Sequence, residues 1–121
     1  MQRIMLKSKI HNAVITEANL VYEGSITIDG AIMDAADILD GERVQVVNLA
    51  NGARFETYAI RGGDHTGVVC LNGPAARLGC VSDRVHILSY ALMNDEDARI
   101  NTPTVIALDE KNEVVAKNSG V

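Results

Sequence analysis

Aromatic side chains are scarce in this chain of 121 residues: they make up 3% of it, and tryptophan is absent. Basic residues are also few, since 11 lysines and arginines stand against 16 aspartates and glutamates and leave a net charge of −5. Nucleic acids and anionic membranes attract basic surfaces, so this balance argues against both partners. No apolar run approaches the roughly 20 residues that a membrane-spanning helix needs.

Cysteine is rare as well. The two cysteines, Cys70 and Cys80, belong to no pattern with the spacing of metal ligands. We therefore expect free thiols, no metal site and a reducing compartment. Arg3 and Lys7 interrupt any apolar segment of a secretory signal. Together these features predict a cytoplasmic protein.

Aliphatic residues take the place of the missing aromatics. Hydrophobic residues reach 47%, and valine, isoleucine and threonine dominate the apolar runs, which is typical of strands. The length suits one domain, residues 1–121. Strands are predicted at 2–8, 10–17, 25–29, 43–49, 54–61, 67–72, 84–92, 103–109 and 112–117. A helix is predicted at 31–39, with Leu39 on its apolar stripe and Asp29 as its cap, and a helical turn at 74–78. So many short strands favour a closed or nearly closed barrel, because closure removes exposed edges.

Gly24 and Ser25 lie between two predicted strands. In most proteins such a pair is simply a turn. It can also cut its own backbone, because the serine hydroxyl can attack the preceding carbonyl and glycine has no Cβ to block that attack. The amide becomes an ester, β-elimination leaves a dehydroalanine, and hydrolysis yields a pyruvoyl group. The dipeptide alone does not distinguish the two interpretations.

A second candidate is the predicted strand at 54–61. Alternation places Arg54, Glu56 and Tyr58 on one face and Thr57 on the other. The segment is consistent with an edge strand that carries a solvated Arg54–Glu56 pair. It is equally consistent with a site in which Arg54 grips a carboxylate and Tyr58 donates a proton.

Three further groups of residues are weaker candidates. Lys9 and His11 share a face if one strand runs through both, although a lone histidine is more often structural than catalytic. His65 and His86 are interpreted as structural or solvated. The turn at 72–76 offers backbone N–H groups that suit a carboxylate, but a tight connection between elements is the commoner role of such a turn.

In combination, four stretches in register resemble the aspartate α-decarboxylase family. They are MLKSKIH at 5–11, YEGSITID at 22–29, NGARFETYAI at 51–60 and NG-AA around 72–76. The resemblance extends from Met5 to about Leu108 and needs no insertion. It implies a mainly β fold, a small six-stranded double-psi β-barrel with short helices.

The resemblance also implies an activity and a way of making the cofactor. The chain would be a proenzyme that cuts itself between Gly24 and Ser25 into residues 1–24 and 25–121, with Ser25 converted to a covalent pyruvoyl group. The mature enzyme would be a homotetramer with active sites between subunits. It would convert L-aspartate to β-alanine and CO₂ for pantothenate and coenzyme A biosynthesis, through a Schiff base on the pyruvoyl group.

Residue roles follow from the same resemblance. Ser25 would be the pyruvoyl precursor, Tyr58 the proton donor, and Gly24, Ser25 and Thr57 the processing residues. Substrate binding would fall to Lys9, Arg54, Thr57, Asn72, Gly73, Pro74 and Ala75, with His11 and Tyr22 in support. Pro74 departs from the family, where alanine is common, and it offers no N–H. A donor in that turn must come from Gly73 or Ala75.

Two alternatives stay open from the sequence. The double-psi barrel also occurs in adaptor domains, so a non-catalytic module that binds peptides or proteins is the competing class. The combination of Gly24-Ser25 with Arg54 and Tyr58 favours the enzyme, because a binding barrel does not need it. Within the enzyme reading, the chain can remain an uncleaved proenzyme, and maturation can require an accessory protein, as in some relatives.

Overall fold

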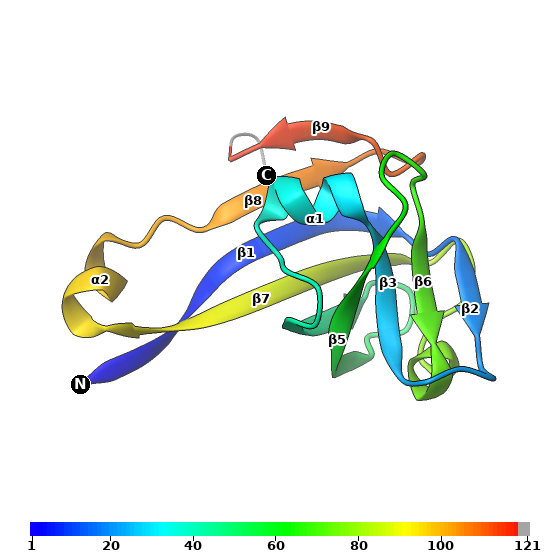
Figure 1. Cartoon of the computed structure of the whole chain (residues 1–121), viewed down its shortest axis with the longest axis horizontal. Coiled ribbons are helices and arrows are strands. Elements are labelled where there is room, and N and C mark those ends of the chain that lie inside the picture. Colours follow the sequence, from blue (N-terminus) through cyan, green and yellow to red (C-terminus); the bar gives the residue numbers. More distant parts are fainter. Residues whose placement is uncertain (119–121) are drawn as a thin grey trace.

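A computed structural model describes residues 1–118 of the chain (Figure 1). The protein is mainly β, with two short α-helices and one 3₁₀ helix in the described part. The strands are β1 (Gln2–Val14), β2 (Glu17–Asn19), β3 (Ser25–Asp29), β4 (Arg43–Asn48), β5 (Arg54–Gly62), β6 (Val69–Asn72), β7 (Arg84–Asn94), β8 (Thr104–Leu108) and β9 (Val114–Lys117). The helices are α1 (Gly30–Ala36), η1 (Gly73–Arg77) and α2 (Asp95–Ile100).

The described strands form one hydrogen-bonded sheet in the order β2-β6-β3-β5-β4-β7-β1-β8-β9. The sheet therefore has nine strands, more than the six expected of the barrel. It is mixed, because β1 with β8, β2 with β6 and β3 with β5 run parallel, whereas the other pairs are antiparallel. β1 and β7 form its longest pair and extend together toward α2, away from β2, β3 and β6 (Figure 1).

The core is aliphatic, as the composition predicts. Its largest fully buried side chains are Ile10, Ile15, Ile26, Ile28, Met33, Leu71, Ile87, Ile106, Val44, Val46, Val69 and Val85. Alternation is regular on β4 and β7, where every second residue is buried over residues 44–48 and 85–89. The intervening residues lie on the opposite face, the outer face of the sheet. That face carries most of the candidate charged residues.

Several predicted boundaries were wrong. Residues 2–8 and 10–17 do not form two strands, because β1 runs unbroken through irregularities after Leu6 and Ile10. β2 and α2 were not predicted. The helix predicted at 31–39 ends at Ala36, where Asp37 adopts a left-handed backbone, and Leu39 is consequently 70% exposed rather than part of the apolar stripe.

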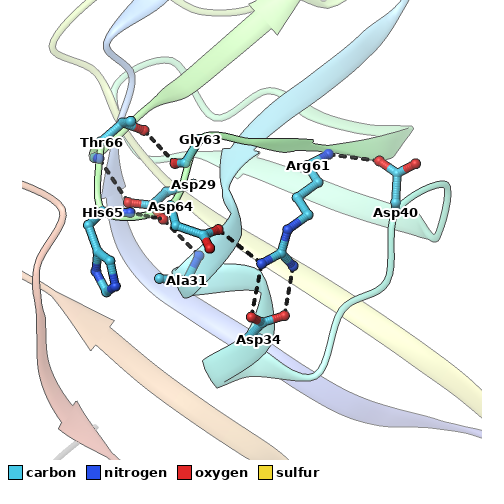
Figure 2. Close-up of polar contacts among 10 residues, drawn as sticks. Asp29, Ala31, Asp34, Asp40, Arg61, Gly63, Asp64, His65 and Thr66 are labelled. Carbon is cyan, nitrogen blue, oxygen red and sulfur yellow. Dashed lines mark hydrogen bonds and ion pairs between the residues drawn. The ribbon is translucent and has the colours of Figure 1, made fainter.

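The Asp29 cap is confirmed and does more than close a helix. Its carboxylate accepts backbone N–H bonds from Ala31, His65 and Gly67, which joins β3, α1 and the loop after β5 (Figure 2). Burial favours the neutral acid, but the bonds from Gly67, Ala31 and His65 outweigh it and hold the pKa of Asp29 below its ordinary value. Beside it, Arg61 bridges Asp34 and Asp64. This network anchors the end of β3 that lies away from Ser25.

None of the helices among residues 1–118 combines the length and the apolar character that crossing a bilayer requires.

Candidate active site

Ser25 opens β3 and is completely buried. The β3–β6 ladder pairs it with Asn72, and the Asn72 side chain donates from Nδ2 to Ser25 Oγ at 2.9 Å. The hydroxyl itself lies 3.4 Å from the carbonyl oxygen of Glu23. Ser25 Oγ thus accepts a hydrogen bond from the Asn72 amide and also faces the peptide segment that precedes Ser25.

Gly73 packs directly against that segment. Its φ is +62°, and a Cβ there would lie 2.4 Å from the Tyr22 carbonyl oxygen and 2.8 Å from the Gly24 nitrogen. Only glycine fits this approach and this backbone conformation. Pro74 follows on the same turn, 3.4 Å from where a Cβ of Gly24 would be. The structure therefore brings Tyr22, Gly24, Ser25, Asn72, Gly73 and Pro74 together at one place, with Ala75 buried just behind them.

Thr57 and Tyr58 lie on β5, next to β3. The parallel ladder begins with Ile26 opposite Ala59, so Ser25 and Tyr58 are the residues that immediately precede the first pair. Paired residues share a face, which places Tyr58 on the face of Ser25 and Thr57 on the face of the core. The alternation expected of this strand is confirmed, with Tyr58 39% exposed and Ala59 buried.

Arg54 lies on the outer face at the start of β5. Its Nη1 donates to Gln45 Oε1 at 2.8 Å, and the Tyr90 hydroxyl contacts the same oxygen at 3.0 Å. The expected Arg54–Glu56 pair is not among the contacts of the described residues, because Glu56 pairs with Arg43 across the β4–β5 ladder. β5 is also not an edge strand, since it lies between β3 and β4.

Lys9 and His11 do share one strand, and His11 stacks on His86 of β7 with ring centroids 4.2 Å apart. The backbone N–H of Asn12 donates to His86 Nδ1 at 3.2 Å, which fixes that nitrogen as an acceptor. Burial, followed by the charges of His11 and Lys9, lowers the pKa of His86 to about 4. Burial and Lys9 likewise lower the pKa of His11, whose buried Nδ1 has no hydrogen-bond partner within residues 1–118.

The neutral His86 ring makes folding stability sensitive to acid. Between pH 6.5 and 4 the unfolded chain binds a proton at this histidine that the folded chain does not, so the free energy of unfolding falls as the pH falls through this window. Because the ring is partly exposed, we expect a loss of about 1–2 kcal/mol. Urea unfolding at pH 7 and pH 4.5 measures it.

Two variants isolate the contribution of His86. His86→Phe keeps a flat ring against His11 and removes the titration, so its stability should depend less on pH. His65→Asn is the matched control, because His65 is exposed and asparagine tolerates its positive φ of 59°. Equal pH slopes in His86→Phe and the parent would contradict this account.

The candidate residues divide into two groups on the sheet. Ser25 lies on β3, whereas Lys9 lies on β1, and β5, β4 and β7 intervene. Four steps between neighbouring strands span about 19 Å along the sheet. Arg54 is aligned with Val47 and His86 across β4 and β7, on the side of Lys9 and His11. Among the described residues of a single chain, no contact therefore connects Lys9 or Arg54 with Ser25.

Three residues that contact the candidate residues received no functional role from the sequence: Thr27 was not considered, Cys70 was expected to be a free thiol, and His86 was interpreted as structural or solvated. His86, Cys70 and Thr27 have no local signal, because their importance comes from partners on other strands. Cys70 is buried and free, and Cys80 is exposed and free, as expected. Two surface cavities, of 490 and 350 Å³, are lined by other residues and do not include Ser25. Within residues 1–118 no three His, Cys, Asp or Glu side chains gather in a metal-binding cluster.

Comparison with known proteins gives a consistent match over the chain. The family model described as aspartate decarboxylase matches residues 1–115. The aspartate 1-decarboxylase of Thermoanaerobacter pseudethanolicus is 57% identical over 115 residues, which cover 95% of this chain and 98% of that protein. Those of Heliobacterium modesticaldum and Kosmotoga olearia are 58% and 55% identical, over 96% and 97% of this chain and 88% and 100% of their own.

Proposed function

The chain belongs to the aspartate decarboxylase family, and from this premise we propose that it is a self-processing, pyruvoyl-dependent aspartate 1-decarboxylase. It converts L-aspartate to β-alanine and CO₂, the step that feeds pantothenate and coenzyme A biosynthesis. The observation that carries this function is the family match over residues 1–115. The contacts around Gly24 and Ser25 supply its chemical rationale.

Self-processing begins at Ser25. Its Oγ faces the Glu23–Gly24 segment and attacks the carbonyl carbon of Gly24, so that the C–N bond breaks and an ester forms. Loss of the α proton and of the ester oxygen then separates the two polypeptides, and residues 1–24 end in a free carboxylate. The remaining dehydroalanine takes up water, loses ammonia and leaves a pyruvoyl group at the head of residues 25–121. Asn72 and Gly73 hold the reacting segment in place during these steps.

The surroundings of Ser25 suit this group. Gly73 leaves no room for a side chain beside residues 22–24, and the Asn72 amide offers a donor where Oγ now lies. When present, the pyruvoyl group supplies the electron sink for the electron pair left as CO₂ departs. Tyr58, on the same face as Ser25, donates a proton to the product carbon. Thr57 serves cleavage and substrate contact, and Gly73 and Ala75 supply backbone N–H groups that Pro74 lacks.

The separation of the candidate residues supports intersubunit sites in a homotetramer. Lys9 lies on the outer face four strands from Ser25, and Arg54 lies on the neighbouring strand β5 but well before Tyr58, the residue level with Ser25; no contact among the described residues joins either cation to Ser25. A neighbouring subunit that packs on this face brings its own cations to Ser25. His11 lies beside Lys9 and Tyr22 beside Gly73, so each supports one half of the composite site. Self-cleavage can also involve a maturation factor, which intact mass with and without a cell extract detects.

The proposal includes closure of the sheet core as a six-stranded double-psi barrel. Two backbone bonds beyond the ends of the ladders support it: Ile15, just after β1, donates to the carbonyl of Asp83, just before β7, and Thr16 donates to the carbonyl of Val69 in β6, so one short segment contacts both β6 and the start of β7. Such links shield strand edges that a flat sheet would expose. We also place the protein in the cytoplasm, where its free Cys70 and Cys80 would stay reduced.

Arg54 holds the β-carboxylate, which remains on the product, since equally firm binding of the departing carboxylate would stabilise the ground state and slow the reaction. Arg54→Ala should therefore raise KM for aspartate about 10- to 100-fold, the scale of a charged hydrogen bond, with a smaller change in kcat. Steady-state rates of CO₂ release measure both. Arg99→Ala is the control, because Arg99 is an exposed arginine of α2 that pairs with Asp95 and not with a residue of the candidate site. An unchanged KM in Arg54→Ala would remove Arg54 from the substrate site.

The decisive test of the function joins two measurements on one preparation. Intact mass under denaturing conditions should give two species that divide after Gly24, the larger with a pyruvoyl terminus. The same sample should release CO₂ from L-aspartate. A chain that stays whole after warm incubation, with and without a cell extract from a related bacterium as a source of maturation factor, would favour the non-catalytic binding barrel instead.

A further inference from the structure

The Asn72 side chain lies between two hydroxyls and a thiol. Its Nδ2 is 2.9 Å from Ser25 Oγ and 2.9 Å from Thr27 Oγ1. Its Oδ1 is 3.2 Å from Cys70 Sγ, which is a short contact for sulfur. The β3–β6 ladder sets this arrangement, because it pairs Ser25 with Asn72 and Thr27 with Cys70. All four side chains therefore lie at one point between two adjacent strands.

The hydroxyls alone do not decide which end of the amide faces Ser25. A serine or threonine hydroxyl can accept from an NH₂ group or donate to a carbonyl oxygen, so both amide orientations satisfy Ser25 and Thr27. The thiol is different, because S–H is a donor and sulfur is only a weak acceptor. With Cys70 as a donor, the carbonyl end of Asn72 is drawn toward the sulfur and the NH₂ end must face Ser25.

We propose that Cys70 is a positioning residue for self-cleavage: its S–H group orients the Asn72 amide so that an N–H, and not the carbonyl oxygen, faces Ser25 Oγ. The inference rests on the proposed function and deepens it. Oγ must give up its proton as it begins to attack Gly24, and an N–H donor stabilises the negative charge on Oγ at this stage, before the new C–O bond passes that charge to the Gly24 carbonyl oxygen. A flipped amide would present a lone pair to the same oxygen and would tie up the hydroxyl proton.

The environment of the thiol keeps it a donor. Cys70 is 6% exposed, and burial together with the nearby Glu17 carboxylate raises its pKa, so the S–H form persists at neutral pH. A second, longer contact at 3.8 Å leads to the Leu71 carbonyl oxygen. The contact with Asn72 is the shorter of the two and is therefore the one assigned here.

Self-cleavage rates test the proposal. The full chain is made by cell-free synthesis, and the uncut fraction is followed by intact mass at timed intervals. Cys70→Ala should cleave about 10-fold more slowly than the parent, the scale of one hydrogen bond. Cys70→Ser supplies a hydroxyl that can donate or accept, so it orients the amide less firmly and should cleave at a rate between those of the parent and Cys70→Ala. Val69→Ala is the matched control, because Val69 is the buried neighbour of Cys70 and pairs with Ile28, not with Ser25 or Thr27. Equal rates for Cys70→Ala and the parent, equal slowing in Val69→Ala, or slower cleavage of Cys70→Ser than of Cys70→Ala would overturn the proposal.

A spectroscopic test does not depend on cleavage. In a Cys80→Ala background the S–H stretching band in the infrared reports Cys70 alone among the cysteines. Replacing Asn72 with alanine should shift this band to higher frequency, because the bond to Oδ1 is lost. An unmoved band would mean that the thiol donates to Leu71 and would overturn the proposal even if the parent chain proved not to cleave. If the parent and Cys70→Ala cleave themselves at the same rate, the role of Cys70 is rejected and the decarboxylase assignment is unaffected.

Discussion

Ser25→Ala is expected to leave the chain as one uncut polypeptide with no measurable decarboxylase activity. Alanine has no Oγ, so the Gly24–Ser25 amide has no internal nucleophile, and the pyruvoyl group cannot form. The side chain is buried and small, so the loss is chemical and not a failure to fold. Intact mass gives the state of the chain, and CO₂ release from L-aspartate gives the activity.

Ser89→Ala is the matched control for this variant. Ser89 is also completely buried and its Oγ contacts that of Ser8 at 2.6 Å, so its loss costs a buried hydrogen bond of about 1 kcal/mol without touching the cleavage segment. It should still cut after Gly24. A Ser25→Ala chain that divides at the same peptide bond would exclude Ser25 as the nucleophile.

Tyr58→Phe is expected to cut itself normally and then to turn over aspartate about 10²- to 10⁴-fold more slowly, the range that a general acid contributes. The ring and its packing remain, and only the hydroxyl that donates the proton is lost. The effect should fall on kcat, because the missing interaction belongs to the chemical step. Single-turnover CO₂ release, started after processing is complete, separates this step from maturation.

Tyr90→Phe provides the comparison, because Tyr90 is another exposed tyrosine whose hydroxyl contacts Gln45 and not the Ser25 region. Its kcat should stay near that of the parent, and any change should fall on KM, because the Tyr90 hydroxyl shares Gln45 Oε1 with Arg54. If Tyr58→Phe released CO₂ as fast as the parent, the proton donor would have to be another group on the face of Ser25.

Local pattern predicts much of this protein, and long-range register accounts for what it misses. The aliphatic core, most strands and the Asp29 cap follow from composition, alternation and capping chemistry, which act over a few residues. The stacking of His11 on His86 depends on how β1 aligns with β7 across an irregular ladder, which no short segment encodes. α2 was missed because its first turn is entirely acidic and its apolar face is small.

The candidate site divides in the same way. Gly24 and Ser25 are recognisable from their chemistry, and Gly73 from the turn that it forms. The bonds from Asn72 to Ser25 and Thr27 arise only when β3 pairs with β6, about 45 residues further along the chain, whereas the contact of Asn72 with Cys70 lies within β6 itself. The separation of Lys9 from Ser25 is a property of strand order, which periodicity does not determine.

The position of β1 has a consequence for the cut protein. β1 lies inside residues 1–24, yet it pairs on one side with β7 and on the other with β8. Cleavage after Gly24 would therefore release no fragment, because both polypeptides would remain hydrogen-bonded in one sheet. Before the cut, the tether keeps β1 at a high effective concentration near its partners; afterwards, an unfolded enzyme must find that strand again by diffusion. Recovery from denaturant should then depend on protein concentration for the mature enzyme and not for the uncut Ser25→Ala chain. The protein would therefore refold as a single chain only before it is processed.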